Sequence, residues 1–358
     1  MNDDRRWMAH ALVLAQRGLY TTHPNPRVGC VLVNAGVMVG QGWHERAGEA
    51  HAEVMALRDA GPRAQGAVAY VTLEPCSHTG RTPPCADALL AAGVQRVVAA
   101  MQDPNPQVAG QGLARLRAAG LEVECGLMEA EAEALNAGFL RRMRGGLPWV
   151  RIKLAASLDG RTAMADGSAR WITGEAARRD VQRWRARSDV VLTGVGTILC
   201  DNPALNLREE LWPVGEFPQR QPWRVVLDSH LRTPLTAQIL RLPGRCTLVG
   251  VEGHHQRQDG TECRQLEGDR PSPEAVLRML AQEGVNEVLI EAGAGIAGSF
   301  MRSGCVDELI LYLAPTLLGS QARPLMDLPI VTMADQLRLR LKDQRAVGDD
   351  WRLVLERT

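Results

Sequence analysis

One break divides a chain that otherwise alternates strand and helix patterns along its length. In residues 28–101, apolar runs typical of buried strands alternate with segments whose apolar spacing is typical of helices. A similar alternation follows the sequence Arg144-Gly-Gly-Leu-Pro148, whose paired glycines and proline interrupt regular structure. At 358 residues the chain is long enough for two domains that each bury a core. We therefore expect two α/β domains, at residues 1–146 and 147–358, with helices packed on largely buried sheets.

The spacing of apolar residues places the expected elements within this frame. In the first half it predicts strands over 28–33, 37–43, 67–73, 96–101 and 121–127, and helices over 5–18, 51–60, 83–93, 110–119 and 129–143. In the second half it predicts strands near 150–156, 189–193, 223–228, 246–251, 286–291 and 306–314, and helices over 174–187, 273–283 and 296–303. The polar or proline-rich stretches 209–222 and 252–271 are expected to form loops.

The charge balance disfavours one broad class of function. The 41 Lys and Arg residues offset 41 Asp and Glu residues, so the formal net charge is zero, and no block of like charges occurs. A large nucleic-acid surface needs a basic patch and is therefore not expected. No apolar run approaches the roughly 18 residues of a membrane span, and the stretch MAHALVLA at 8–15 lacks the features of a secretory signal. We expect a cytoplasmic protein without nucleic-acid or membrane partners.

The eight cysteines are expected to be thiols or metal ligands. Disulfides are rare in the cytoplasm, and a chain with cores of this size needs no covalent cross-links. The even number of cysteines leaves a disulfide framework as the alternative.

His51, Cys76 and Cys85 form a set of three potential zinc ligands. His51 opens a predicted helix, Cys76 follows the end of a predicted strand, and Cys85 begins the next helix. Three protein ligands leave a fourth tetrahedral position for water, which distinguishes a catalytic zinc site from a closed structural one, and that water ionises near neutral pH. Glu53 is expected beside the metal, where it can carry a proton between the water and a departing amine. The pattern predicts zinc-dependent hydrolytic deamination.

Each member of this set also has an ordinary interpretation. His51 alone is typical of a helix start, Glu53 of a solvated first-turn acid, and the cysteines of buried thiols. The spacing also departs from the zinc nucleobase-deaminase signature, H-x-E with P-C-x-x-C, because eight residues instead of two separate the cysteines. The placement of all four residues at the right ends of strand and helix favours the zinc site.

Longer motifs around these residues resemble the bifunctional deaminase-reductase family of riboflavin biosynthesis, in which the eight-residue gap between the zinc cysteines is a family feature. The motifs are THPNPRVGCVLV, GWHERAGEAHAEVMAL, VTLEPCSHTGRTPPCADALL and MQDPNPQVAGQG in the first half, and KLAASLDGRTA, WITGEAAR, GTILCDNPALNLR, IEAGAGIAG and DELILYLAPTLLG in the second. The resemblance covers nearly the whole chain. It implies a cytidine-deaminase-like α/β/α sandwich followed by a dihydrofolate-reductase-like α/β domain. It also implies that a diaminopyrimidinone ribosyl phosphate, a small phosphorylated pyrimidine, loses its ring amino group, and that NADPH then reduces the ribosyl chain to ribityl.

The resemblance assigns roles to residues of the deaminase domain. It makes His51, Cys76 and Cys85 the Zn²⁺ ligands and Glu53 the acid/base. It implies substrate contacts at Asn25, His44, Arg81, Asp103 and Asn105. Arg81 suits the substrate phosphate because a guanidinium is a planar cation with several donors, although a solvated loop charge is the alternative.

In the second half, the segment 291–298 contains G-x-G-x-x-G between a predicted strand and a predicted helix. Glycines there let the backbone approach a pyrophosphate. A plain tight turn is the alternative, and the acidic residue of a Rossmann motif, about 20 positions on, is missing. The resemblance implies NADPH contacts at Ala155, Trp171, Thr197, Asp201, Ser229, Gly293, Ala294, Gly295, Ile296, Ala297, Gly298 and Ser299. It implies substrate contacts at Lys153, Arg185, Leu205, Arg208 and Glu291.

The chain departs from the family pattern at one serine. The family pattern Gly-x-Ser-x-Trp-Ile reads Gly-Ser-Ala-Arg-Trp-Ile over residues 167–172, so the hydroxyl of Ser168 stands one position early. We therefore do not expect the contact that the family serine makes.

Lysine is rare in this chain, since Lys153 and Lys342 are the only lysines among the 41 basic residues. Lys153 lies in a predicted strand between two apolar residues. An ammonium is a compact donor whose pKa falls readily on burial, whereas a guanidinium is a wide planar group that stays charged. We predict that Lys153 holds a ribose oxygen and donates a proton to it during reduction. The alternative is a strand lysine that faces solvent.

Two other classes of function are open alternatives. One is a nucleoside or nucleic-acid zinc deaminase whose second half only binds or dimerises, and the other is a noncatalytic zinc-stabilised binding module. The complete set of reductase motifs disfavours the first, and an open three-ligand site with Glu53 beside it disfavours the second. For the bifunctional enzyme we also expect a homo-oligomer, a dimer or a tetramer.

Overall fold

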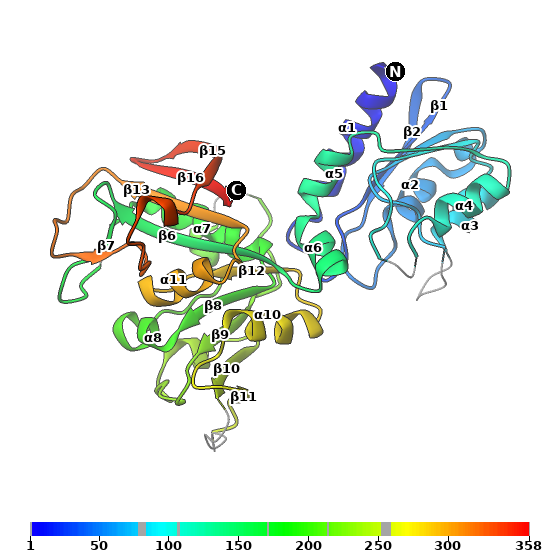
Figure 1. The fold of residues 1–358 in the computed structure, drawn as a ribbon. Helices are drawn as coiled ribbons and strands as arrows, with labels where there is room; N and C mark the ends of the chain where they lie inside the picture. Colours follow the sequence, from blue (N-terminus) through cyan, green and yellow to red (C-terminus); the bar gives the residue numbers. More distant parts are fainter. Residues whose placement is uncertain are drawn as a thin grey trace. The chain divides into compact units, whose positions relative to one another are not determined.

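The chain forms two compact units, Met1–Gly146 and Leu147–Thr358, and each is described by itself (Figure 1). The structure is a computed structural model that describes residues 2–77, 84–105, 108–169, 172–212, 215–251 and 259–357. Trp171 and Arg81, both expected to contact ligands, lie outside the described residues.

The first unit is built on a five-stranded sheet with the order β2-β1-β3-β4-β5. Its strands are β1 (Gly29–Asn34), β2 (Val37–Trp43), β3 (Val68–Val71), β4 (Arg96–Ala99) and β5 (Glu122–Cys125). Strand β1 pairs antiparallel with β2 and β3, whereas β3, β4 and β5 are parallel. The helices are α1 (Asn2–Gln16), α2 (Ala52–Ala60), α3 (Cys85–Ala91), α4 (Gln111–Ala118), α5 (Glu129–Leu135) and α6 (Ala137–Gly145). A short 3-10 turn, η1 (Gly61–Ala64), follows α2.

Helices cover both faces of this sheet, which makes an α/β/α sandwich. A side chain on Gly29 of β1 would collide with the backbone of α1 at Ala11, whereas one on Gly42 of β2 would collide with the backbone of α2. Gly42 pairs with Cys30, the neighbour of Gly29, and successive strand residues face opposite sides, so α1 and α2 lie on opposite faces. Helix α3 packs beside α2, and α4 beside α3. The sequence-predicted sandwich is confirmed.

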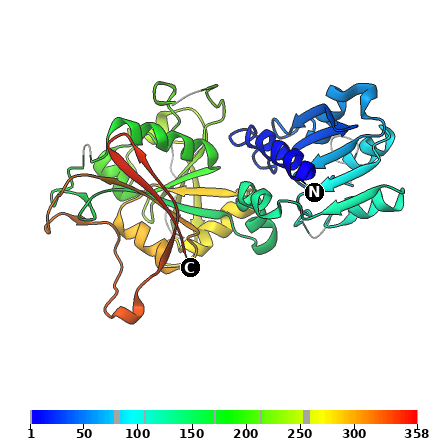
Figure 2. The ribbon, with the colours of Figure 1, turned by 90° about the horizontal axis from the view of Figure 1, so that it is seen from above.

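The second unit holds a nine-stranded sheet with the order β11-β10-β9-β8-β12-β6-β13-β16-β15. The strands are β6 (Trp149–Ser157), β8 (Val190–Gly194), β9 (Trp223–Leu227), β10 (Cys246–Val251), β11 (Glu262–Leu266), β12 (Glu287–Ile290), β13 (Glu308–Ala314), β15 (Leu339–Val347) and β16 (Asp350–Arg357). The strands from β11 to β13 in this order are parallel, and β16 and β15 add an antiparallel hairpin, which carries the C-terminus (red in Figure 2). A separate two-stranded ribbon pairs β7 (Arg161–Ala163) with β14 (Arg323–Pro324).

Helices also cover both faces of the larger sheet. Val190 and Leu192 of β8 join one core with α10 (Pro273–Gln282) and α11 (Ala294–Arg302). Val191 joins the other core with α7 (Glu175–Arg187) and α8 (Val195–Asp201). Shorter turns complete the unit: α9 (Gln238–Arg241), η2 (Glu209–Leu211) and η3 (Met333–Asp335). Because both faces of the sheet are buried, the sequences of its strands are continuous apolar runs.

Two expectations about elements were wrong in detail, and one hairpin was missed. The stretch 252–271 contains strand β11, and the hairpin β15–β16 was not expected at all. The predicted helix over 129–143 is two helices that meet at Asn136. Strand β15 is mostly exposed, so its apolar residues alternate with Arg and Lys and give a weaker signal than the buried runs.

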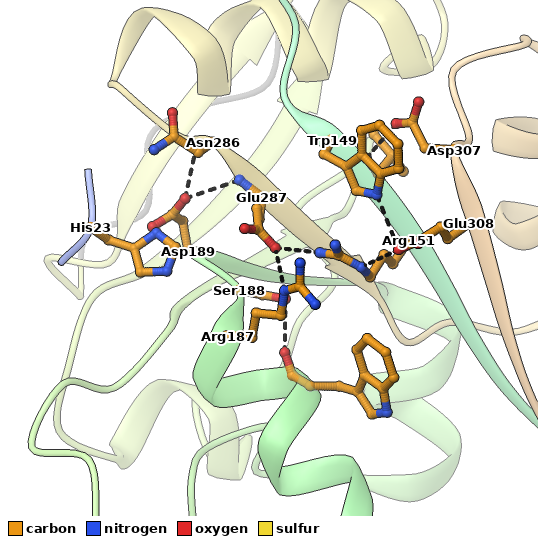
Figure 3. A network of polar contacts seen from close by, with 12 residues as sticks. His23, Trp149, Arg151, Arg187, Ser188, Asp189, Asn286, Glu287, Asp307 and Glu308 are labelled. Carbon is orange, nitrogen blue, oxygen red and sulfur yellow. Dashed lines mark hydrogen bonds and ion pairs between the residues drawn. The ribbon is translucent and has the colours of Figure 1, made fainter. Parts of the chain in front are cut away.

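A buried ionic cluster joins the amino ends of three strands in the second unit (Figure 3). Arg151 of β6 forms ion pairs with Glu287 of β12 and Glu308 of β13, and all three side chains are at most 5% exposed. Arg187 at the end of α7 pairs with Glu287 at 3.1 Å, and the Trp149 indole donates to Glu308 at 3.1 Å. The cluster fixes the sheet at the end opposite to its carboxyl edge.

No helix among the described residues is long and apolar enough to cross a membrane. All eight cysteines lie in the described part of the chain, and no disulfide joins any of them there.

Candidate active sites

His51, Cys76 and Cys85 meet at the carboxyl edge of the first sheet. His51 is the N-cap of α2, Cys76 follows β3, and Cys85 is the first residue of α3. The His51 Nδ1 atom lies 3.2 Å from Cys85 Sγ and 3.6 Å from Cys76 Sγ, and the Cys85 amide donates to Cys76 Sγ at 3.3 Å. Among the described residues, this is the one group of His, Cys, Asp and Glu side chains compact enough to hold a metal ion. One imidazole and two thiols form a donor set that fits Zn²⁺ and leaves a coordination position open.

Glu53 lies in the first turn of α2, directly beside this group. Its side chain is buried, with 3% of the residue exposed. Burial raises the pKa of the Glu53 carboxyl to about 7, and the carboxyl interacts with both His51 and Cys85. A bound divalent cation would oppose this rise. The position suits a group that accepts and donates a proton near the metal.

Two of the expected substrate contacts, Asn25 and His44, bond to each other near His51. The Asn25 amide and His44 Nε2 are hydrogen-bonded at 3.0 Å, and His44 Nδ1 meets the Ala50 carbonyl at 3.1 Å. The ring centroid of His44 lies 5.4 Å from that of His51. Burial lowers the pKa of His44, which favours a neutral ring.

The other two described contacts, Asp103 and Asn105, lie on the loop after β4, where Asp103 accepts the Asn105 amide at 2.9 Å. The sequence analysis missed the residue that holds this loop. Glu74, two residues before Cys76, is buried and accepts the amides of Asp103 and Gly110 at 3.0 and 2.9 Å. An acid at the end of the apolar run AYVTLE, directly before Pro-Cys, was the available signal.

A cavity of about 640 Å³ opens in the second unit and collects most of the expected reductase residues. Those that line it are Lys153, Ala155, Arg185, Thr197, Asp201, Leu205, Arg208, Glu291, Gly293, Ala294, Gly295 and Ile296. They come from β6, from α7, from α8 and the segment that follows it, and from the segment that joins β12 to α11 with the first turn of that helix. The carboxyl edge of a parallel sheet is where α/β proteins bind ligands.

The amino end of α11 fits the phosphates of a dinucleotide. Gly293 is its N-cap and offers no side chain to the first amides of the helix. A Cβ added at Gly293 or Gly295 would meet nothing within 4 Å, so a ligand can approach the backbone there. Free amides at a helix start favour an anion. This cradle is the observation that supports NADPH in the cavity.

Four expected NADPH contacts do not line the cavity: Ala297, Gly298, Ser299 and Ser229. Ala297 is fully buried in the core. A Cβ on Gly298 would lie 2.1 Å from the Asp327 carbonyl, so this glycine permits a close approach of α11 to the chain around Asp327. Of the three glycines in G-x-G-x-x-G, the first two face the cavity and the third has a packing role.

Lys153 faces the cavity and not bulk solvent. Its residue is half-buried, and its Nζ lies 5.8 Å from the ring centroid of the fully buried Tyr312. Burial lowers the pKa of Lys153, with the Glu291 carboxylate acting in the opposite direction. The strand places the ammonium on the face of the sheet opposite to Ile152 and Leu154.

Arg185 and Glu291 form a paired cation and anion in the same cavity. The guanidinium donates to both carboxylate oxygens, at 2.6 and 3.0 Å, and also to the Asn206 carbonyl at 3.0 Å. Burial opposes ionisation of Glu291, but the charges of Arg185, Lys153 and Arg208 keep its pKa below the usual value. Glu291 therefore stays an acceptor next to Lys153.

The displaced serine turns away from this cavity. The Ser168 amide and hydroxyl both donate to Asp166 Oδ1, at 2.8 and 2.7 Å, on the surface. Gly167 and Ala169 line the cavity, whereas Ser168 does not. Ala169 thus stands on the cavity wall, at the sequence position where the family pattern has its serine.

Comparison with known proteins finds a matching family model in each unit. The family model for the cytidine and deoxycytidylate deaminase zinc-binding region matches residues 1–101, and that for the RibD C-terminal domain matches residues 148–353. The riboflavin biosynthesis protein RibD of Escherichia coli is 51% identical over 364 residues, which cover 97% of each chain. The chain belongs to the RibD family. The family member from Haemophilus influenzae is 47% identical and covers 99% of this chain and 97% of its own.

Solved structures of RibD proteins share the whole fold. Acinetobacter baumannii RibD matches with a TM-score of 0.93 and 48% identity, over 100% of this chain and 99% of that one. A Thermotoga maritima protein described as a diaminohydroxyphosphoribosylaminopyrimidine deaminase and 5-amino-6-(5-phosphoribosylamino)uracil reductase matches with a TM-score of 0.90 and 28% identity, with the same coverage. Membership of the family makes this chain a bifunctional enzyme of riboflavin biosynthesis, with a zinc-dependent deaminase domain and an NADPH-dependent reductase domain.

Proposed function

We propose that the first unit hydrolytically deaminates 2,5-diamino-6-ribosylamino-4(3H)-pyrimidinone 5′-phosphate and that the second unit reduces the ribosyl chain of the product to ribityl. The observation that supports this most strongly is the cluster of His51, Cys76 and Cys85 with the buried Glu53 beside it. The separate cavity with its glycine cradle supports the second step. The match of residues 148–353 to the RibD C-terminal domain disfavours a second half that only binds or dimerises.

In the deaminase, His51, Cys76 and Cys85 would hold the zinc ion. Zinc, when bound, supplies a Lewis acid that makes water nucleophilic near neutral pH. Glu53 takes a proton from the attacking water and delivers it to the amino nitrogen, so that the bond between the ring carbon and this exocyclic nitrogen breaks, the water oxygen stays on the carbon and ammonia departs. Asn25 and His44 position the pyrimidine against this pair.

In the reductase, Lys153 holds a ribose oxygen through its ammonium. NADPH, when bound, supplies the hydride for the adjacent carbon. Lys153 gives its proton to the oxygen as the C–O bond of the ribose ring opens, and the low pKa that burial gives it favours this transfer. Glu291 fixes Arg185 and lies close enough to Lys153 to stabilise the ammonium before the transfer.

The variant Glu53→Gln tests the role of Glu53, because it keeps the size of the side chain and removes the titrating group. We expect the zinc content to stay unchanged while ammonia release falls by about 10²-fold or more, the scale of acid/base assistance. Reduction of an already deaminated substrate should persist. The exposed Glu49, on the loop before α2, provides the matched control Glu49→Gln. Ammonia release near the parental rate in Glu53→Gln would remove Glu53 from the mechanism.

A cytoplasmic location and a homo-oligomeric state stay predictions. Fractionation of cells and light scattering of the purified chain would test them.

A further inference from the structure

Glu74 connects three segments around the zinc cluster through a single carboxylate. Its Oε2 accepts the amides of Asp103 and Gly110, at 3.0 and 2.9 Å. Its Oε1 accepts the amides of Gly112 and Leu113, at 2.8 and 3.2 Å. The side chain is buried, with 5% of the residue exposed. Four backbone amides on one buried carboxylate make a strong, charge-assisted junction.

The carboxylate acts as the cap that α4 lacks in its own sequence. The N-cap residue is Gly110, which has a positive φ of 77° and no side chain to offer. The first amides of a helix need acceptors, and an anion there is stabilised by the helix dipole. Glu74, which lies between the end of β3 and Cys76, supplies the acceptor and the negative charge from a distant position in the sequence.

The same stretch fixes the zinc ligand. The Glu74 amide donates to the Met101 carbonyl at 2.9 Å, and the Cys76 carbonyl accepts the Ala86 amide at 3.1 Å. A Cβ on Gly112 would lie 1.9 Å from the Pro75 carbonyl, so α4 packs directly on the backbone next to Cys76. Residues 74–76 are therefore held from both sides, by the segment after β4 and by α3.

From these contacts we infer that Glu74 is a positioning residue for deamination, which sets the loop carrying Asp103 and Asn105 at a fixed place relative to the ligand Cys76. This inference rests on the proposed deaminase function of the first unit. In this arrangement the metal site and the substrate loop share one anchor. Loss of the carboxylate releases the loop, while Cys76 remains held through the Ala86 amide. The effect is thus expected on substrate binding and not on the metal.

The variant Glu74→Gln tests the inference in the full chain. The amide keeps one acceptor oxygen but turns its NH₂ group toward two backbone donors. We expect KM for deamination to rise at least tenfold, kcat to change less than threefold, and zinc content to match the parent. Reduction of an already deaminated substrate by the same protein is the internal control for folding.

Asp87→Asn is the matched control, because Asp87 of α3 pairs with Arg115 of α4 at 2.7 Å, on the surface. It loosens α4 without touching the loop, and its KM should stay parental. An unchanged KM in Glu74→Gln overturns the inference, whether or not zinc content and kcat fall. If Glu74→Gln does not fold, Glu74→Asp, which withdraws the carboxylate by one methylene, must raise KM or the inference falls. A parental protein that releases no ammonia would contradict the proposed function instead.

Discussion

At the scale of single residues, the two lysines of the chain lie in contrasting places. Lys153 faces the reductase cavity beside the Arg185–Glu291 pair, whereas Lys342 lies at the sheet edge, with its side chain 42% exposed, and pairs with Glu308 and Glu356. The cavity position requires a compact donor that can lose its proton, which a guanidinium cannot do.

Lys153→Arg is expected to lower kcat/KM for reduction at least tenfold, about 1.4 kcal/mol of transition-state stabilisation. The wider group must fit next to Arg185 and does not release its proton. Deamination and NADPH binding should stay parental. The control Lys342→Arg should reduce substrate normally, because an arginine can pair with the same two carboxylates, Glu308 and Glu356, at the sheet edge. A Lys153→Arg protein that reduces at the parental rate would leave the proton donor unidentified.

Ser168 and Ala169 allow a second test at this scale. We expect Ser168→Ala to leave reduction unchanged, since its hydroxyl bonds to Asp166 on the surface. Ala169→Ser places a hydroxyl on the cavity wall and should tighten substrate binding by about 0.5–1.5 kcal/mol, the net worth of one hydrogen bond. Dissociation constants for the deaminated substrate measure both effects. A large loss of affinity in Ser168→Ala would show that this hydroxyl reaches the substrate after all.

At the scale of elements, the sequence predicted what depends on neighbouring residues and missed what depends on distant ones. The helix starts at His51 and Cys85 and the strand end before Cys76 follow from local apolar runs, glycines and prolines. The three proposed zinc ligands could therefore be assigned from local patterns. Glu74 was missed because the helix that it caps begins 37 residues later along the chain, and no local pattern links the two.

The ionic cluster of β6, β12 and β13 leads to a prediction about acid stability (Figure 3). Arg151 and Lys342 overcome the cost of burial and lower the pKa of Glu308 from 4.5 to about 2. A carboxyl with a lowered pKa in the folded state stabilises that state above its unfolded pKa, and the stabilisation disappears as pH falls. We expect the second unit to lose up to about 3 kcal/mol of unfolding free energy between pH 5 and pH 2, at about 1.4 kcal/mol per pKa unit.

Urea midpoints measured across this pH range test the prediction. Glu308→Gln should be less stable than the parent at pH 7 and should show a flatter pH dependence below pH 5. The control Glu274→Gln removes an exposed pair with Arg278 on α10 and should change the midpoints little. Parallel pH profiles for the parent and Glu308→Gln would contradict the role given to Glu308.

At the scale of the whole molecule, the chain carries two chemistries on two compact units. Each has its own sheet and its own core, and each collects its proposed site residues toward the carboxyl ends of its parallel strands. The motifs of both units were readable in the sequence because they lie at these strand ends and helix starts. The details of packing around the sites could not be read from the sequence. Gly298 has a packing role, and the Glu74 carboxylate that holds the Asp103 loop was missed.

The central claim is that one chain performs a deamination and then a reduction, and mass analysis of the products tests it most directly. The purified protein is incubated with the diaminopyrimidinone ribosyl phosphate, with and without NADPH, alongside the variant Cys85→Ser, which removes a zinc ligand. We predict that the parent replaces one amino group by oxygen without NADPH and also adds two hydrogens with it. Cys85→Ser should leave this substrate unchanged yet reduce the deaminated compound. Deamination by Cys85→Ser, or a parental product that never gains hydrogen when NADPH is present, would contradict the account.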